Sequence, residues 1–483
     1  MEKRGGLIMV TNELKWTPIQ SDEIEKANFR FEANVFNIDA RAAYLTLKKC
    51  KYPTVKLWSS EGLVKNAHYP GRFKRIYVDK ENGFPMILPS QMSELKPKAT
   101  KFISIKTVNA IGKLDVQPNT LLVTRSGTIG NCTIVTKTLQ GFTMSDDIIR
   151  IVFNKHYDLG YVYSFLKTKT GQLILATNNY GSVIQHIEPE HLENVTIPNA
   201  PENIKKEIHE KVMRSFALRD ESNELIEKAE KLLMDSLNLP DFNCLKPDLY
   251  APKEDIQTFV VNLDLLNDRF EGSYHVPIVN KIIDCLLDSG ASILPLGSGE
   301  LTSKIIMAGR FKRNYVEEGE GTVFLGGKQI YELDPTGKKY LSVKQHDKRI
   351  ASQLFIKENM IAITCSGTIG KVNIIPKHWE KWTMSQHVLR AVPKNKSIAG
   401  YLYIWLNSDF GRELIISQTY GSVVDEIHDK HLAKIPIPIL KDEQIIKEVN
   451  DLALKANELR SEAYYLEQDA IKQMNEEVIF TTK

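Results

Sequence analysis

The amino-acid sequence predicts an α+β protein built from two similar lobes, each followed by a long helix, with the halves related by a pseudo-two-fold axis. Three observations predict this fold: one half of the chain repeats the other, Pro-rich segments end each copy, and a long helical pattern follows each of those segments. The chain of 483 residues is also too long to form a single hydrophobic core.

The internal repeat is the strongest of these observations. Thr124-Arg-Ser-Gly-Thr-Ile-Gly130 returns 240 positions later as Thr364-Cys-Ser-Gly-Thr-Ile-Gly370, and the same shift matches Tyr180-Gly-Ser-Val183 with Tyr420-Gly-Ser-Val423. Upstream, Gly71-Arg-Phe-Lys-Arg75 returns at Gly309 with a shift of 238, which indicates a small loop insertion. A period of half the chain is far longer than the ~20–50 residues of solenoid units, so it indicates a duplicated domain.

Within each copy the pattern predicts both strands and helices. Apolar, β-rich runs at residues 121–124 and 132–135 flank the Ser-Gly-Thr-Ile-Gly segment, and residues 361–364 and 372–375 repeat them. Residues 161–175 and 401–416 have the apolar spacing of a helix. The Ser-Gly-Thr-Ile-Gly segment itself is either a tight turn that uses glycine at positive φ or a backbone nest for an anion.

Each copy is followed by a stripe of apolar and small residues at steps of three and four, with charged residues between them. This spacing is typical of a coiled coil, so we expect the two helices to pair with each other; the alternative is that each packs only on its own lobe. Pro201 suits the entrance of the first helix, because its missing N–H costs nothing there. The stripes are Ile204, Ile208, Val212, Ser215, Leu218, Ser222, Leu225, Ala229, Leu232 and Ser236, and Ile446, Val449, Leu452, Ala456, Leu459, Ala463, Leu466, Ala470 and Met474.

These patterns divide the chain into six parts. We expect an N-terminal arm at 1–22, a first lobe at 23–200, a first spacer helix at 201–240, a linker at 241–260, a second lobe at 261–440 and a second spacer helix at 441–483. Residues 1–8 are expected to be either a disordered arm or a misplaced start, with translation then beginning at Met9.

Charge separates the lobes from the helices. Residues 201–240 carry a net charge of −2 and residues 441–480 carry −5, so the rest of the chain, whose total is +3, carries +10. Basic lobes joined by acidic helices suit binding to a phosphate backbone. The five cysteines include no C-x-x-C pair, which predicts free thiols in a reducing cytoplasm, and no apolar run approaches the ~20 residues of a membrane span.

Several repeated polar residues are candidate DNA contacts. In Gly-Arg-Phe-Lys-Arg the alternation of an extended segment puts the cations on one side and lets Phe anchor inward, while the Ser and Tyr of the other two motifs can bond to phosphate. A solvated basic edge or a helix-ending turn explains the same residues without DNA. The candidates are Arg72, Lys74, Arg75, Arg125, Ser126, Tyr180, Ser182, Arg310, Lys312, Arg313, Tyr420 and Ser422.

Sequence signatures of catalysis and of metal binding are absent. Gly321-Thr-Val-Phe-Leu-Gly-Gly-Lys328 resembles a phosphate loop, but Gln329 stands where Ser or Thr is needed. His186 and His191 suggest a metal site, yet His186 aligns with Glu426 in the second copy, so a structural histidine is the better interpretation. We therefore expect a non-catalytic chain with no metal.

The sequence resembles a known family, the specificity subunit of type I restriction-modification systems. The resemblance covers nearly the whole chain and is carried by Ser126-Gly-Thr-Ile-Gly130, Ser366-Gly-Thr-Ile-Gly370, Gly181-Ser-Val-Ile-Gln-His-Ile187 and Gly421-Ser-Val-Val-Asp-Glu-Ile427. It implies two target recognition domains, each reading one half of a bipartite double-stranded DNA target, and two helices that pair antiparallel.

The resemblance also implies partners and cofactors. Two methyltransferase subunits would dock on the chain and bind S-adenosylmethionine, and ATP-dependent restriction subunits would use ATP and Mg, so this chain would bind no cofactor and no membrane. Three alternatives remain open from the sequence: a recognition subunit of a type II nuclease-methyltransferase system, a stand-alone DNA-binding interaction protein, and an enzyme whose site matches no known motif.

Overall fold

A computed structural model describes residues 18–26, 29, 36–107, 112, 114–127, 129–176, 186–245, 259–266, 269–421 and 424–482 of the chain. Most of the predicted N-terminal arm, including Met9, and most of the predicted linker therefore lie outside the described residues. The first short helix, α1 (Ser21–Lys26), precedes the first lobe.

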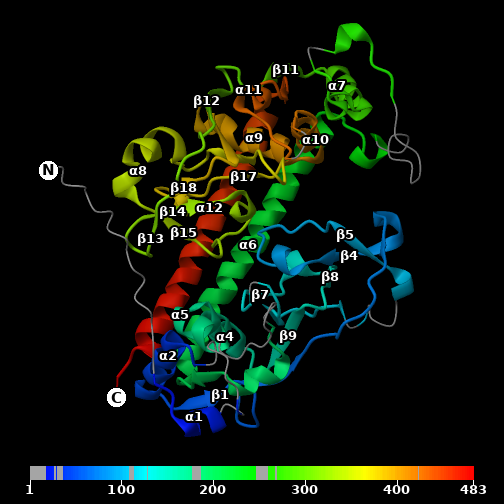
Figure 1. Cartoon of the computed structure of the whole chain (residues 1–483). Coiled ribbons are helices and arrows are strands. Elements are labelled where there is room, and N and C mark those ends of the chain that lie inside the picture. The colour runs from blue at the N-terminus through cyan, green and yellow to red at the C-terminus, as the bar shows by residue number, and fades with distance from the viewer. Residues whose placement is uncertain are drawn as a thin grey trace, which may run out of the picture.

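Two long helices run side by side and antiparallel through the middle of the molecule (Figure 1). They are α6 (Glu202–Ser236), which begins after Pro201, and α12 (Glu443–Gln473), which continues as a π-helical turn, η13 (Met474–Ile479). Lys211 pairs with Asp469 at 2.6 Å and Lys228 with Glu448 at 3.6 Å, so the residue numbers rise along one helix as they fall along the other. The expected helix pair is confirmed.

Within the described residues, each lobe contains two four-stranded sheets and one two-stranded sheet, and the strand orders of the two lobes are the same. In the first lobe the orders are β2-β9-β6-β7, β3-β5-β4-β8 and β1-β10; in the second they are β12-β19-β16-β17, β13-β15-β14-β18 and β11-β20. The two strands that flank the Ser-Gly-Thr-Ile-Gly segment in each lobe are antiparallel neighbours, as the sequence predicts.

The elements of the first lobe are α2 (Ile38–Lys49), β1 (Thr54–Lys56), β2 (Val64–His68), β3 (Tyr77–Val78), β4 (Gly83–Ile87), β5 (Lys101–Ser104), β6 (Leu121–Thr124), β7 (Cys132–Ile134), β8 (Thr143–Met144), β9 (Ile148–Phe153), α4 (Asp158–Lys167), α5 (Lys169–Ala176) and β10 (Thr196–Pro198). Those of the second lobe are α7 (Pro277–Asp288), β11 (Ser292–Pro295), β12 (Thr302–Ile306), β13 (Tyr315–Val316), β14 (Thr322–Leu325), β15 (Lys339–Leu341), α8 (Val343–Arg349), β16 (Ile361–Thr364), β17 (Val372–Ile374), β18 (Thr383–Met384), β19 (Val388–Pro393), α9 (Lys396–Asn407), α10 (Asp409–Ser417), α11 (Asp429–Leu432) and β20 (Pro436–Ile439).

The single helix predicted at 161–175, and its copy at 401–416, is wrong: each is two helices. The break falls at Thr168 and Ser408, whose hydroxyls accept the N–H of Gly171 at 3.0 Å and Gly411 at 3.1 Å and so start a new helix. The apolar spacing continues across the break, which is why the pattern alone indicates one helix.

Several repeated residues maintain the fold of each lobe. Tyr161 donates its hydroxyl to Pro198 O at 2.5 Å, and Tyr401 donates to Pro438 O at 2.7 Å, which fixes each lobe helix to the strand before the long helix. Arg150 and Arg390 are fully buried and donate to the carbonyls of Met144 and Met384 in the repeated Thr-Met-Ser segments. Burial lowers the pKa of both guanidinium groups to about 10.

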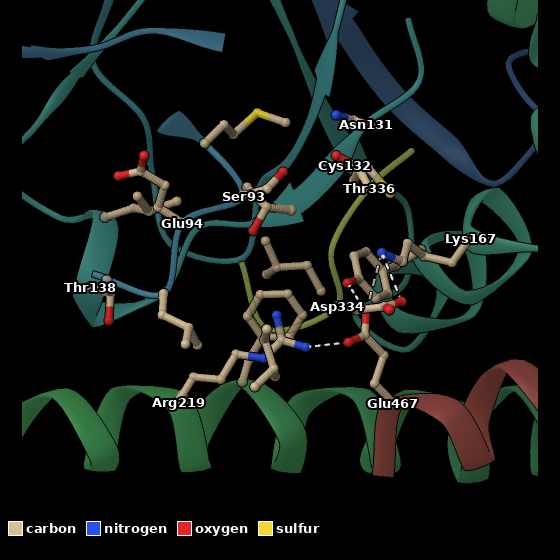
Figure 2. A pocket seen from close by; sticks show the side chains of 18 of the residues that line it. Ser93, Glu94, Asn131, Cys132, Thr138, Lys167, Arg219, Asp334, Thr336 and Glu467 are labelled. Atoms are coloured by element: carbon tan, nitrogen blue, oxygen red, sulfur yellow. Dashed lines mark hydrogen bonds and ion pairs between the residues drawn. The ribbon is translucent and has the colours of Figure 1, made fainter. Parts of the chain in front are cut away.

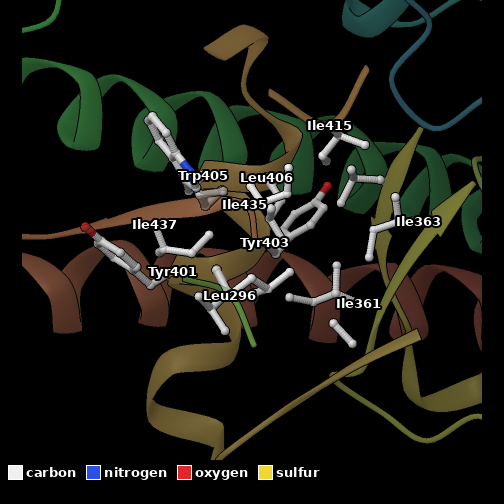
Figure 3. Close-up of a cluster of buried hydrophobic side chains, with 14 of the residues drawn as sticks. Leu296, Ile361, Ile363, Tyr401, Tyr403, Trp405, Leu406, Ile415, Ile435 and Ile437 are labelled. Atoms are coloured by element: carbon white, nitrogen blue, oxygen red, sulfur yellow. The ribbon is translucent and has the colours of Figure 1, made fainter. Parts of the chain in front are cut away.

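Each lobe packs across both long helices. The core of the first lobe includes Val212 of α6 and Ala470 of α12, and the core of the second includes Leu233 of α6 and Val449 of α12. Figure 3 shows the second core, in which side chains of α9 such as Tyr403 and Leu406 lie against the strand residues Ile361 and Ile363, with both long helices alongside.

The attachment of each lobe to its helix depends on a glycine. Gly160 and Gly400 donate their N–H groups to His209 Nδ1 at 3.2 Å and Asn450 Oδ1 at 2.9 Å on the long helices. A Cβ at Gly400 would lie 2.4 Å from Asn450 O, so no larger residue fits without moving the helices apart.

We predict that Gly400→Ala lowers the free energy of unfolding by about 1–3 kcal/mol, because the added methyl overpacks the contact between α9 and α12. Gly299→Ala is the matched control, since a Cβ there meets nothing within 4 Å and the backbone conformation is ordinary. Denaturant unfolding followed by circular dichroism measures both; equal stability of the two variants would contradict the close approach.

Candidate functional site

Three segments that repeat in the sequence meet at one place in the second lobe. They are the Gly309–Arg313 segment between β12 and β13, the turn between β16 and β17, and the segment after α10. Glu426 joins them: its backbone pairs with Ser366 and with Tyr420 in isolated β-bridges, and its carboxylate lies 3.2 Å from the Arg310 guanidinium. Segments over 100 residues apart in sequence thus form one surface.

The same convergence occurs in the first lobe with different side chains. Ser126 pairs with His186 in the equivalent bridge, and Arg75 Nε donates to Asp146 Oδ1 at 3.0 Å. Arg125 lies over the ring of Tyr69 at 4.5 Å and forms ion pairs with Asp147 and Glu188. Where the first lobe is described, the 71–75 segment, the turn after β6 and residues 186–188 therefore lie together, as residues 309–313, the turn after β16 and residues 426–428 do in the second lobe.

The predicted contact residues differ in exposure. Four cations of the two Gly-Arg-Phe-Lys-Arg segments are exposed, namely Arg72, Lys74, Arg310 and Lys312, whereas Arg75, Arg313, Ser126 and Tyr420 are half-buried. Phe311 packs edge-on against Phe324, so the aromatic residue anchors the segment inward as the alternation predicts. Tyr180, Ser182 and Ser422 lie outside the described residues.

Arg125 is placed differently from the other candidates. It is buried, with a side chain only 5% exposed, and both of its carboxylate partners belong to the same lobe. This placement favours a role in holding the three segments together, and direct contact of Arg125 with DNA stays a prediction.

The Ser-Gly-Thr-Ile-Gly segments form tight turns. Gly127, Gly130, Gly367 and Gly370 all have positive φ, between 73° and 84°, which glycine adopts without steric cost. The N–H of Gly130 donates to Thr124 O and that of Gly370 to Thr364 O, both at 3.2 Å. Because these N–H groups are used within the chain, the geometry favours the turn over an anion-binding nest.

Reasoning from the sequence missed the residues that differ between the two surfaces. Asp146, Asp147 and Glu188 of the first lobe correspond, at a shift of 240, to Gln386, His387 and His428 of the second. The sequence does contain a signal for these residues. Each position differs between the two copies and lies beside a segment that is the same in both. Burial and the charge of Arg313 lower the pKa of His387, and His428 stacks on Tyr420 with ring centroids 4.9 Å apart.

His191, one of the two histidines considered as metal ligands, has another partner. His191 Nδ1 accepts the N–H of Glu188 at 3.1 Å, which closes the turn before β10. Over the described part of the chain, no group of three or more His, Cys, Asp or Glu side chains is arranged to hold a metal ion. None of the helices in that part is long and apolar enough to cross a membrane.

A polar cavity of about 300 Å³ lies where both lobes meet the long helices (Figure 2). Arg219 of α6 donates to Glu467 of α12 at 2.5 Å, while Lys167 of α4 lies 3.7 Å from the same carboxylate and Tyr163 donates its hydroxyl to it. Asp334 approaches Lys167 from the second lobe at 3.9 Å. Burial alone would raise the pKa of Glu467, but Arg219 and Lys167 outweigh it and hold that pKa well below its ordinary value.

Both halves of the chain match the same family model. The sequence model of the family described as "Type I restriction modification DNA specificity domain" matches residues 33–230 and 303–472. The comparison with curated proteins found no match.

The chain is also similar to solved structures, three of which are as follows. The S subunit from M. genitalium is 16% identical with a TM-score of 0.32, over 87% of this chain and 99% of that one. The HsdS subunit from Thermoanaerobacter tengcongensis is 15% identical with a TM-score of 0.27, over 87% and 95%. A structure titled for the complex assembly and conformational transition of the type I system is 16% identical with a TM-score of 0.27, over 86% and 97%.

The buried charges around Glu467 give a pH-dependent prediction. Glu467→Gln should lower the free energy of unfolding by about 3 kcal/mol near neutral pH, because Arg219 and Lys167 lose the charge opposite them. Since the pKa of Glu467 is lowered by folding, its contribution is present above about pH 4.3 and is lost as the pH falls below that value.

Urea unfolding at several pH values from about 7 to about 3 measures this difference. Glu458→Gln, at an exposed position of the same helix, is the control and should change stability little at any pH. A cost of Glu467→Gln that stays constant throughout the acid range would show that the carboxylate contributes by shape and not by charge.

Proposed function

The chain belongs to the family of type I restriction-modification DNA specificity subunits, and on that premise we propose that each of its two lobes reads one half of a bipartite double-stranded DNA target. As a member of this family the chain recognises the DNA target within a restriction-modification complex and is not itself catalytic. The observation that carries the proposal is that equivalent described residues beside the repeated motifs meet in both lobes, which are held on one antiparallel helix pair.

The two half-targets differ in sequence, because equivalent positions of the two surfaces carry different chemistry. The first lobe offers the half-buried acceptor Asp147 with Arg75 beside it, whereas the second offers the half-buried Gln386 and His387. Carboxylates accept from cytosine N4, whereas Gln pairs with adenine and Arg with guanine, so the two surfaces favour different bases.

The exposed cations contact phosphates in this proposal. Arg72 and Lys74 of the first lobe and Arg310 and Lys312 of the second are exposed, next to the differing residues. Contacts of Arg and Lys with phosphates position a protein on the duplex, while the neighbouring side chains read the base edges. The net charge of +10 outside the two helical segments supports this assignment.

The partners follow from the same premise. Two methyltransferase subunits dock on the chain and bind S-adenosylmethionine, ATP-dependent restriction subunits supply ATP and Mg, and the complex works in the cytoplasm. The pseudo-two-fold arrangement supports two copies of one partner, because each lobe with its share of the helix pair presents an equivalent surface. Co-purification of the chain with a methyltransferase tests this part of the proposal.

Replacing Arg310 and Lys312 together with Ala should weaken DNA binding by the complex of this chain with its methyltransferase partner. If both residues bind phosphates, the slope of log K against log salt should become shallower by about 1.8, or about 0.9 for each phosphate that the variant no longer neutralises. If one of them reads a base, the second half-sequence should become less specific while the first stays the same. Filter binding or fluorescence anisotropy over a salt series measures both effects.

The control replaces Lys394 and Lys396 with Ala, two exposed cations of the same lobe. Lys394 lies just beyond the end of β19 that is remote from His387, so the control removes equal charge away from the proposed surface. An equal loss of affinity and slope in both double variants would contradict the assignment of Arg310 and Lys312 to the DNA interface.

A further inference from the structure

The two lobes contact each other directly on the pseudo-two-fold axis. Glu94 and Glu332, which are equivalent at a shift of 238, pair in an isolated antiparallel bridge, and Leu95 donates its N–H to Tyr331 O at 2.8 Å. A point at which equivalent residues meet lies on the axis that relates them. The contact sits over the crossing of α6 and α12, where Leu218, Leu459 and Leu333 pack in one cluster.

Ion pairs extend this contact on both sides. Glu94 lies 3.0 Å from Lys371, and both side chains are largely buried. Lys167 of the first lobe approaches Asp334 of the second at 3.9 Å, and the exposed pair of Lys98 and Asp409 is 3.2 Å apart. All three pairs join one lobe to the other.

Side chains of both long helices form hydrogen bonds with the loops of this contact. Asn223 of α6 donates its side-chain amide to Leu95 O at 2.7 Å, and Gln468 of α12 donates to Asp334 Oδ2 at 3.3 Å. Each loop that reaches across the axis is therefore bonded to the opposite lobe and to a helix. Neither lobe can shift along the helices without breaking several of these bonds.

The ion pairs do not follow from the duplication of the fold. The position equivalent to Lys371 is Asn131, the one equivalent to Asp334 is Lys96, and the one equivalent to Asp409 is Lys169. None of these pairs could therefore form in the same way on the other side of the axis. In this they differ from the repeated Tyr161 and Tyr401, which make the same bond in both lobes.

We infer that these residues form an interlobe latch that fixes the distance and rotation between the two reading surfaces and so determines which spacer the complex accepts. The latch comprises Glu94, Leu95, Lys98 and Lys167 of the first lobe and Tyr331, Asp334, Lys371 and Asp409 of the second. The inference rests on the proposed function, in which each lobe reads one half-target.

The geometry of DNA explains how the latch selects a spacer. One base pair more or less moves the second half-target by about 3.4 Å and rotates it by about 35°. For both lobes to stay on their half-targets, the lobes would have to move by a similar amount. The Glu94–Lys371 pair, at 3.0 Å and largely buried, would then break and leave two charges unpaired away from water.

The test uses the complex with its methyltransferase partner and measures methyl transfer to duplexes that carry the native spacer or one base pair more or less. Lys371→Glu and Glu94→Lys should each raise the rate on the altered spacers relative to the native one by about tenfold, within the usual range of coupling between two sites. The half-sequences should not change. Combining the two substitutions should recover part of the discrimination, because opposite charges again face each other.

Lys155→Glu is the matched control, since it reverses the charge of an exposed Lys whose partner, Glu202, begins the long helix of the same half. Its spacer preference should equal that of the unmodified complex. Failure of the unmodified complex to methylate any bipartite duplex would overturn the proposed function and the inference with it. Native activity with unchanged spacer preference in both single variants would overturn the latch alone.

A cross-link provides a second test, in which a covalent bond between the lobes takes the place of the Glu94–Lys371 ion pair. Leu95 N–H bonds to Tyr331 O, so Glu94 and Glu332 form a non-hydrogen-bonded pair, whose Cα atoms are about 4.5 Å apart and suit a disulfide. The oxidised Glu94→Cys, Glu332→Cys variant should keep methylation at the native spacer and discriminate at least as strongly as before. Loss of native-spacer activity on oxidation, restored by reduction, would show that the lobes must separate and would overturn the latch.

Discussion

The antiparallel pairing of α6 and α12 determines where both lobes lie, because neither helix belongs to one lobe alone. The first half of α6 and the last part of α12 complete the core of the first lobe. The second half of α6 and the first part of α12 complete the core of the second. A lobe without either helix would expose part of its core. Both helices together therefore fix the position of each lobe. The distance between the two surfaces proposed to contact DNA then depends on the whole helix pair.

The duplication separates residues that maintain the fold from residues that vary. Repeated side chains such as Arg150 and Arg390, or Tyr161 and Tyr401, are buried and make the same bonds in both lobes. The residues that differ, such as Asp147 and His387, lie where the three repeated segments meet. A chain can change what one lobe recognises by altering such positions, because the bonds that Arg150, Arg390, Tyr161 and Tyr401 repeat in both lobes do not involve them.

Sequence reasoning could predict the architecture because periodicity and repetition report burial. The stripe along residues 204–236 and its copy indicate the helix pair, and the glycines of Ser-Gly-Thr-Ile-Gly indicate tight turns. It could not predict the break at Thr168, since the apolar spacing continues through it, nor the burial of Arg125, since the residues around it do not reveal where the guanidinium points. The contact of Glu94 with Lys371 joins residues 277 positions apart and follows no pattern in the chain.

In the proposed function, two lobes on one shared helix pair read two separate half-targets at a fixed distance. Methylation-aware sequencing of DNA modified by the complex is the decisive measurement, because it shows every modified site at once. We expect one bipartite motif, with two unrelated half-sequences and a spacer of a single length between them. A contiguous modified motif, or half-sequences joined by spacers of many lengths, would contradict it.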